Sequence, residues 1–211
     1  DISMVLDGAA PAVAGWNMHH RYLVGVPMVQ VETLGAGGGS ICRVNNGEIE
    51  VGPASAGAEP GPICYGRGGT QPTITDALLM LGILSADAEF AGGSFSLRRD
   101  GVEAAFAALG SAMGYCAEDA AFDCWRIVNA NMTQGVRRIT AGKGVDPNEM
   151  CMLAYGGNGP AFAGIQAEEL GINRVLVPKA SPTFSALGTL VADPAIDEER
   201  AKPRDAAWLP H

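Results

Sequence analysis

The sequence lacks an excess of basic residues. It has 14 lysines and arginines against 23 aspartates and glutamates, which gives a formal net charge of −9 and a pI of about 4.7. A protein that binds nucleic acid needs a basic face to neutralise phosphates, so this class of function is excluded. The sequence also lacks an apolar run of about 18 residues, and its first residues lack the basic and apolar regions of a secretory signal. We therefore expect neither a membrane span nor a signal peptide, and we predict a cytoplasmic location.

Histidine and paired cysteines are also scarce. The three histidines, His19, His20 and His211, lie outside the glycine-rich motifs, and the five cysteines include no Cys-x-x-Cys pair. A structural zinc site or a Ser-His-Asp triad needs histidine close to other candidate groups, so neither is expected. An odd number of widely spaced cysteines is typical of reduced thiols that are mostly buried. Cys64 has no histidine near it in sequence, which disfavours it as a nucleophile.

Glycine is abundant, with 29 residues in 211. Four of them fall in the stretch Gly35-Ala36-Gly37-Gly38-Gly39-Ser40, between an apolar run at 23–34 and a β-like run at 41–44. The missing Cβ atoms let a ligand or another segment approach the backbone, and free N–H groups in such a loop suit an oxyanion. The loop has neither the Gly-Lys-Ser/Thr ending of a P-loop nor GxGxxG spacing, so a tight turn is the alternative.

Periodicity divides the chain into three parts. Residues 1–91 form a β-rich region, with strands expected at 1–6, 23–34, 41–44 and 48–51 and a hairpin turn at Asn45-Asn46-Gly47. The long stretch 52–75 has no periodicity and is therefore predicted to be functional, and Thr75-Asp76 would cap a helix at about 77–84. Residues 92–148 form a helical subdomain, with helices at about 101–113 and 117–141. The longer helix carries a stripe predicted as core: Phe122, Trp125, Val128, Met132, Val136 and Ile139.

Residues 149–211 carry a second glycine motif, Gly156-Gly157-Asn158-Gly159-Pro160. It lies between a short apolar strand at 150–155 and a helix at about 161–170, and another strand follows at 174–177. This order predicts a βαβ unit with a parallel strand pair. A helix that begins directly after such a turn offers free N–H groups to a nucleotide or phosphate, whereas close packing of strand and helix is the alternative.

Three charged residues are further candidates for chemistry. Asp1, at the end of a strand, suits Mg²⁺ bound through water or the orientation of an attacking group. Asp76 is the second carboxylate, with a helix cap as its alternative role. Arg67 lies among glycines, where its guanidinium would reach a phosphate or carboxylate, unless it is a solvated loop residue. A cluster near the start either lines a pocket or, as we favour, forms a surface turn: Trp16, His19, His20 and Tyr22.

Eight motifs, in this order along the chain, carry a resemblance to a known family. They are residues 35–41 (GAGGGSI), 51–62 (VGPASAGAEPGP), 64–69 (CYGRGG), 72–77 (PTITDA), 131–132 (NM), 143–147 (KGVDP), 155–160 (YGGNGP) and 184–188 (FSALG). The chain resembles, over nearly its whole length, the hydantoinase A/oxoprolinase family of ATP-dependent enzymes, which includes the ATP-binding subunits of acetone and acetophenone carboxylases. The chain departs from the family pattern at Leu78, Ala161-Phe162 and Pro182-Thr183, which leaves the substrate open.

The resemblance implies a fold and a place within it. The family has an actin-like ATPase fold, in which two RNase H-like lobes close on ATP and each has a mixed sheet flanked by helices. This chain would be the C-terminal portion. A phosphate motif of the family would end at Asp1, so its glycines would precede residue 1. Gly156-Gly157-Asn158-Gly159-Pro160 resembles the adenosine motif of that fold.

The resemblance also implies a function. The chain would belong to an ATP-hydrolysing subunit that phosphorylates a substrate oxygen, for opening a lactam or hydantoin ring or for carboxylating a ketone. ATP and Mg²⁺ would be the cofactors, with a hydantoinase B-type subunit and the upstream part of the same subunit as partners. The alternative is a non-catalytic scaffold subunit of the same fold. The implied site residues are Asp1 for Mg²⁺ or water, Arg67 and Asp76 in the long loop, Gly37, Gly38 and Gly39 in the active-site loop, and Gly156, Gly157 and Gly159 for adenosine.

Overall fold

The structure, a computed structural model, describes residues 1–13, 16–18, 22–24, 27–88, 90–194 and 196. The chain divides into two units, one formed by residues 1–32 and 188–211 and the other by residues 33–187. The described residues combine short strands with helices, which agrees with the expected mixed α/β class. Some predicted features lie outside the described part: the side chains of Trp16, His19, His20 and Tyr22, and the tail at 197–211.

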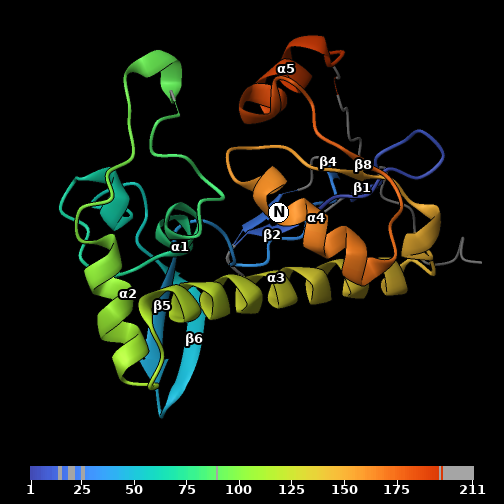
Figure 1. Cartoon of the computed structure of the whole chain (residues 1–211). Coiled ribbons are helices and arrows are strands. Elements are labelled where there is room, and N and C mark those ends of the chain that lie inside the picture. Colours follow the sequence, from blue (N-terminus) through green and yellow to red (C-terminus); the bar gives the residue numbers. More distant parts are fainter. Residues whose placement is uncertain (14–15, 19–21, 25–26, 89, 195, 197–211) are drawn as a thin grey trace, which may run out of the picture. The chain divides into compact units, whose positions relative to one another are not determined.

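The described residues of the first unit include four short strands in two antiparallel pairs (Figure 1). β1 (Ala12–Val13) pairs with β4 (Met28–Val29), and β2 (Trp16–Met18) pairs with β3 (Tyr22–Val24). The prediction of one strand at 23–34 was therefore wrong, because Pro27 and residues 30–31 lie outside the strands. The expected strand at 1–6 is reduced to isolated bridges at Ile2 and Leu6.

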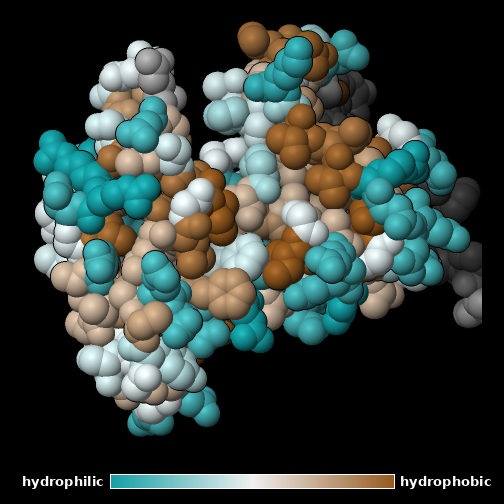
Figure 2. Space-filling model, in the orientation of Figure 1, coloured by the Kyte–Doolittle hydropathy of each residue, from teal (hydrophilic) through white to brown (hydrophobic). Residues whose placement is uncertain are grey.

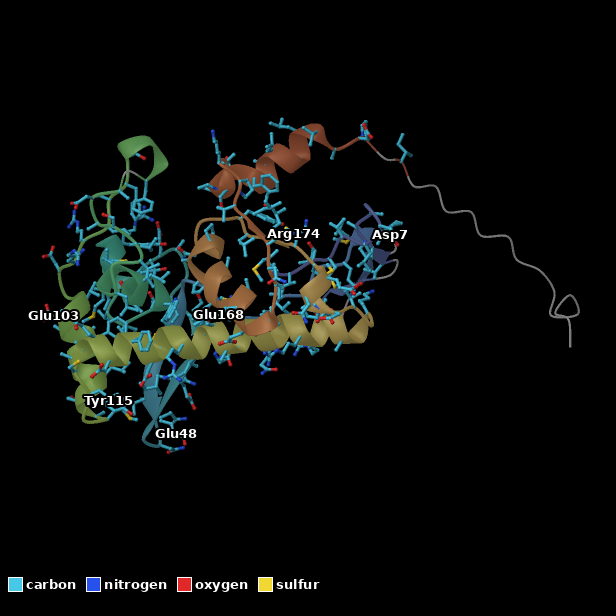
Figure 3. The ribbon with its side chains drawn as sticks, turned by 45° about the vertical axis from the view of Figure 1, so that its right-hand side comes forward. Asp7, Glu48, Glu103, Tyr115, Glu168 and Arg174 are labelled. Atoms are coloured by element: carbon cyan, nitrogen blue, oxygen red, sulfur yellow. The ribbon has the colours of Figure 1, made fainter. Side chains whose placement is uncertain are left out.

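The second unit begins with the hairpin that the sequence predicted. β5 (Ser40–Asn45) pairs antiparallel with β6 (Glu48–Ser55). Asn46 and Gly47, between them, both have positive φ angles of 50° and 81°, as a tight hairpin turn requires. Glu48, next to this turn, is labelled at the tip of the hairpin in Figure 3. The second strand is longer than predicted and takes in the first residues of the long loop.

Helices of the second unit pack around one long helix, α3 (Ala117–Gly142). α1 (Ile74–Met80) and α2 (Val102–Ser111) lie beside its first half, and α4 (Gly159–Leu170) lies alongside it further on (Figure 1). Short 3₁₀ turns occur at Ile63–Tyr65, Ala91–Gly93, Pro147–Glu149 and Ser181–Thr183, and α5 (Phe184–Val191) crosses the boundary between the units. Both predicted helices of the 92–148 segment are confirmed.

The core of the second unit lies where α1, α2 and α3 meet. Leu78, Phe106 and Val128 are completely buried there. The predicted stripe on α3 is buried at Val128, and three of its members are partly buried and packed against the cores: Trp125, Met132 and Val136. Phe122 is 46% exposed and was therefore wrong as a core residue. Smaller residues, Ala121 and Cys124, occupy the buried face instead, because α1 and α2 approach α3 closely.

The predicted βαβ unit is confirmed. β7 (Met152–Leu153) and β8 (Val175–Leu176) form a parallel pair, and α4 connects them. α4 ends at Gly171, whose φ of 70° permits the left-handed C-cap that stops the helix. Since β7 is followed by the second glycine motif, this unit places that motif at the start of α4.

Candidate functional site

The loop at 35–40 is held by hydrogen bonds between Gly37 and Ser40. The Gly37 N–H donates to Ser40 Oγ at 3.0 Å, and the Ser40 N–H donates back to the Gly37 carbonyl at 3.1 Å. The Gly39 carbonyl accepts from the Ala56 N–H at 2.9 Å, so the end of β6 supports the loop. A Cβ atom on Gly37 would meet no atom within 4 Å, which leaves the outer side of this residue open.

The next side of the site is the start of α1. Thr73 is the N-cap of this helix, and its hydroxyl accepts from the Asp76 N–H. The prediction that Thr75-Asp76 caps the helix was therefore wrong, because the helix begins earlier than predicted. Both residues lie inside it, with Asp76 at the third position. Asp76 completes a capping box, because its carboxylate accepts from the Thr73 N–H at 2.9 Å.

Asp76 is also the acceptor for a neighbouring loop. Its carboxylate accepts from the N–H groups of Ile63 at 3.2 Å and Cys64 at 2.7 Å, and from the Thr73 hydroxyl at 2.8 Å. The side chain is completely buried. A buried carboxylate needs such a set of donors, so Asp76 fixes the loop at 61–65 to the start of α1.

The turn at 156–160 forms the opposite side. Gly156 has a φ of 88°, and Ser181 holds it twice: the Gly156 N–H donates to the Ser181 carbonyl at 2.8 Å, and Ser181 Oγ donates to the Gly156 carbonyl at 3.1 Å. Asn158 is the N-cap of α4 but makes no side-chain capping bond. Gly157 has no atom within 4 Å of a Cβ position, so the turn is open on that side.

The two glycine motifs meet at Thr75. The Thr75 N–H and hydroxyl both donate to the Gly38 carbonyl, at 2.8 Å and 2.9 Å. Asn158 Nδ2 donates to the Thr75 hydroxyl at 3.5 Å. A Cβ atom on Gly38 would lie 2.6 Å from the Thr75 hydroxyl and would overlap the Asn158 amide. Segments 37 and 83 residues away from Thr75 thus come together at one hydroxyl.

Sequence reasoning missed Thr75, Asn158 and Tyr65 as members of this site. Tyr65 is half-buried, and its side chain interacts with the Thr75 hydroxyl. Burial raises the pKa of the Tyr65 phenol, as does Cys64, while the Thr75 hydroxyl lowers it. Tyr65 and Asn158 stand inside glycine-rich motifs and Thr75 stands in the segment 72–77 (PTITDA), but only the folded chain brings these segments together.

Arg67 and Asp1 occupy different surroundings. Arg67 is exposed, and its guanidinium carbon lies 5.3 Å from the centre of the Phe95 ring, a cation–π distance. Phe95 in turn contacts Tyr65 edge to face, with ring centres 5.1 Å apart. Asp1 is exposed and belongs to the first unit, whereas the glycines of both motifs belong to the second. The described residues contain no cluster of three metal-ligating side chains.

The cysteines are free thiols, as expected. Burial raises the pKa of the Cys64 thiol, and Asp76 beside it adds to the effect. Contact with Cys124 raises the pKa of Cys42, and burial of Cys42 acts in the same direction. A thiol that resists ionisation is a poor nucleophile, which agrees with the low expectation for Cys64.

Comparison with known proteins gives consistent results. A family model described as Hydantoinase/oxoprolinase matches residues 1–198. Caprolactamase subunit alpha of Pseudomonas jessenii is 43% identical over 180 residues, covering 84% of this chain and 26% of that protein. Acetophenone carboxylase gamma subunit of Aromatoleum aromaticum is 34% identical over 197 residues, covering 92% of this chain and 26% of that protein.

Two solved structures have the same fold over most of the chain. The crystal structure of ATP-dependent caprolactamase from Pseudomonas jessenii matches with a TM-score of 0.76 and 41% identity, covering 86% of this chain and 26% of that one. A nucleotide-free acetone carboxylase structure matches with a TM-score of 0.78 and 32% identity, covering 88% of this chain and 26% of that one. The chain therefore spans about a quarter of the length of these relatives.

Proposed function

Because the chain belongs to the hydantoinase/oxoprolinase family, we propose that it is part of an ATP-hydrolysing subunit that activates a substrate oxygen by phosphorylation. The reaction would be ATP-dependent opening of a lactam or hydantoin ring, or ATP-dependent carboxylation of a ketone. The chain would form the C-terminal portion of an actin-like ATPase with RNase H-like lobes. The observation that carries this proposal is the meeting of two open glycine motifs at the Thr75 hydroxyl.

The turn at 156–160 fits a nucleotide. Its N-cap residue, Asn158, makes no side-chain capping bond, so the Gly159 N–H at the start of α4 has no side-chain cap. The next residue, Pro160, has no N–H, and the Ala161 N–H donates to the Asn158 carbonyl at 3.0 Å. The first turn of α4 contains no acidic residue. Such an uncapped helix start, beside open glycines, favours an anionic ligand. ATP bound with Mg²⁺ would supply the phosphoryl group that makes an amide or enolate oxygen reactive. Gly156, Gly157 and Gly159 would lie against the adenosine.

The loop at 35–40 would shape the substrate side. Gly37 is half-buried but has no atom within 4 Å of a Cβ position, while Gly38 and Gly39 are held by hydrogen bonds from Thr75 and Ala56. A loop that is held on one side and open on the other presents its backbone without having to reorganise when a substrate binds.

The charged candidates receive separate roles. Asp1 would hold Mg²⁺ or position water. Arg67 would contact an anionic part of the substrate, since its guanidinium is exposed and steadied by the Phe95 ring. Asp76 would act as a positioning group, because its oxygens are already used by Ile63, Cys64 and Thr73.

The parallel strands β7 and β8 support a contact with another part of the complete subunit. Leu153, Leu176 and Val177 are 46%, 59% and 53% exposed, although parallel sheets are nearly always covered on both faces. Hydrophobic residues are visible on the surface around α4 and β8 in Figure 2. We assign this surface to the upstream part of the same subunit. A hydantoinase B-type subunit would be the second partner, because matched relatives are described as subunits.

None of the helices in the described part of the chain has the length and apolar character to cross a lipid bilayer. A cytoplasmic location is part of the proposal.

ATP turnover by the complete multi-subunit complex tests the proposed function. We expect ATP hydrolysis that depends on an added cyclic amide or ketone, and a requirement for bicarbonate would select the carboxylase branch. Asp1→Asn should abolish turnover. Asp7→Asn is the matched control, because Asp7 is an exposed carboxylate of the same unit in a turn with φ 51°, which asparagine tolerates (Figure 3). A complex without substrate-dependent turnover, unaffected by Asp1→Asn, would instead be a non-catalytic scaffold.

A further inference from the structure

The contact between the two glycine motifs is a chain of two hydrogen bonds with a fixed direction. The Thr75 hydroxyl has one proton, which it donates to the Gly38 carbonyl at 2.9 Å. Its lone pairs are left for Asn158 Nδ2, from which it accepts at 3.5 Å, and for the Tyr65 phenol, which also interacts with this hydroxyl. The side chain of Thr75 is 3% exposed, so water does not compete readily for either bond.

We propose that Asn158 and Thr75 are positioning residues that couple the nucleotide turn at 156–160 to the substrate loop at 35–40. This inference rests on the proposed function, which assigns the two ligands to these two motifs. A ligand against the turn alters the position of Asn158, and the Thr75 hydroxyl passes that change to the Gly38 peptide. Each ligand therefore binds more tightly when the other is present.

Other hydrogen bonds hold both motifs without using this link. Gly156 is held by Ser181 and Gly39 is held by Ala56, so the outer ends of both motifs are fixed within the chain. Asn158 is the member of the turn that contacts the other motif, and it is free of a helix-capping bond that would compete for its side chain. Gly38 has no room for a Cβ atom, because the Asn158 amide and the Thr75 hydroxyl fill that space.

Substitutions at Thr75 test the role of its hydroxyl apart from that of its backbone N–H. Thr75→Val has nearly the same shape and keeps the backbone N–H that donates to the Gly38 carbonyl at 2.8 Å, so the loop stays attached. It removes only the hydroxyl. Thr75→Ser restores the hydroxyl and loses the methyl group. Asn158→Ala removes the donor on the other side, and Ser181→Ala loosens the same turn without breaking the link.

The test is a calorimetric titration of the complete complex with a non-hydrolysable ATP analogue. The Kd is measured without and with a saturating amount of the cyclic amide or ketone that supports turnover. The wild-type complex should bind the analogue about five-fold or more tightly when the substrate is present, which is an ordinary coupling between ligands. The ratio should fall below about two-fold in Thr75→Val and Asn158→Ala, and remain at the wild-type value in Thr75→Ser and Ser181→Ala.

Other results overturn the inference. A wild-type complex whose two Kd values are equal has no coupling to transmit. A wild-type ratio in Thr75→Val shows that the hydroxyl is not used, and a ratio lost equally in Thr75→Ser shows that the methyl group matters instead. The double variant Thr75→Val/Asn158→Ala should be no worse than either single variant, because both break one link. Failure of the wild-type complex to bind the analogue at all would instead overturn the proposed function.

Discussion

Removing the carboxylate of Asp76 should destabilise the chain more than removing any exposed carboxylate. Asp76→Ala takes the acceptor away from three backbone N–H groups and one hydroxyl, belonging to Ile63, Cys64 and Thr73. A buried donor without a partner costs roughly 1–3 kcal/mol, and the Thr73 hydroxyl can turn to another acceptor. Some relaxation of the loop lets water reach the remaining donors. We therefore expect a loss of about 3–5 kcal/mol in the free energy of unfolding, out of a total of about 5–15 kcal/mol.

Urea-induced unfolding followed by circular dichroism measures this loss, and hydrogen exchange locates it. The amides of Ile63 and Cys64 should lose protection in Asp76→Ala before those of α1 do. Asp123→Ala is the matched control, because Asp123 makes only an exposed ion pair with Arg126 at 3.4 Å. Its effect should stay within about 0.5 kcal/mol. Equal stability of the two variants, with both amides still protected, would refute the assigned role of Asp76.

Three other predictions concern the loop, a surface carboxylate and the thiols. Gly38→Ala should destabilise the chain by about 1–3 kcal/mol in urea unfolding, while Gly37→Ala should stay within about 0.5 kcal/mol, because of these two glycines Gly38 lacks room for a Cβ atom and Gly37 has it; equal effects would contradict this. Hydrogen bonds from Asn45 and Arg43 hold the pKa of Glu50 below its ordinary value, so the contribution of this carboxylate to stability is present at neutral pH and lost as the pH falls through the lowered pKa. Glu50→Gln should therefore lower the Tm slightly at neutral pH and leave it unchanged in strong acid; a Tm difference that grows in acid would contradict the sign. Iodoacetamide should modify Cys116 and Cys151 in the native chain, as detected by mass spectrometry, and early labelling of a buried thiol would contradict the core. The thiols that should react only after unfolding are Cys42, Cys64 and Cys124.

Local sequence patterns were sufficient to predict those elements whose structure depends on a single segment. The turn at Asn46 and Gly47 needs two residues that accept positive φ, and this requirement is visible in the sequence. The length of α3 follows from its apolar repeat, and the parallel strand pair follows from the order of strand, glycine turn and helix.

Long-range contacts decide what the sequence left open. The start of α1 at Ile74 depends on Thr73 and on the loop that Asp76 binds, 12 and 13 residues earlier. The meeting of Gly38, Thr75 and Asn158 joins segments that no local periodicity relates. Phe122 repeats with the core stripe of α3 yet remains exposed, because the helices that cover α3 reach its small residues instead.

Photoaffinity labelling of the complete complex with azido-ATP tests most directly that this chain holds the nucleotide. We expect the labelled peptide to contain residues 156–160, and we expect excess ATP to prevent the labelling. The Asn158→Ala variant, which keeps every glycine of the turn, should still be labelled. Labelling that ATP does not prevent, or that falls only on peptides outside this turn in a complex that hydrolyses ATP, would contradict the proposed nucleotide site.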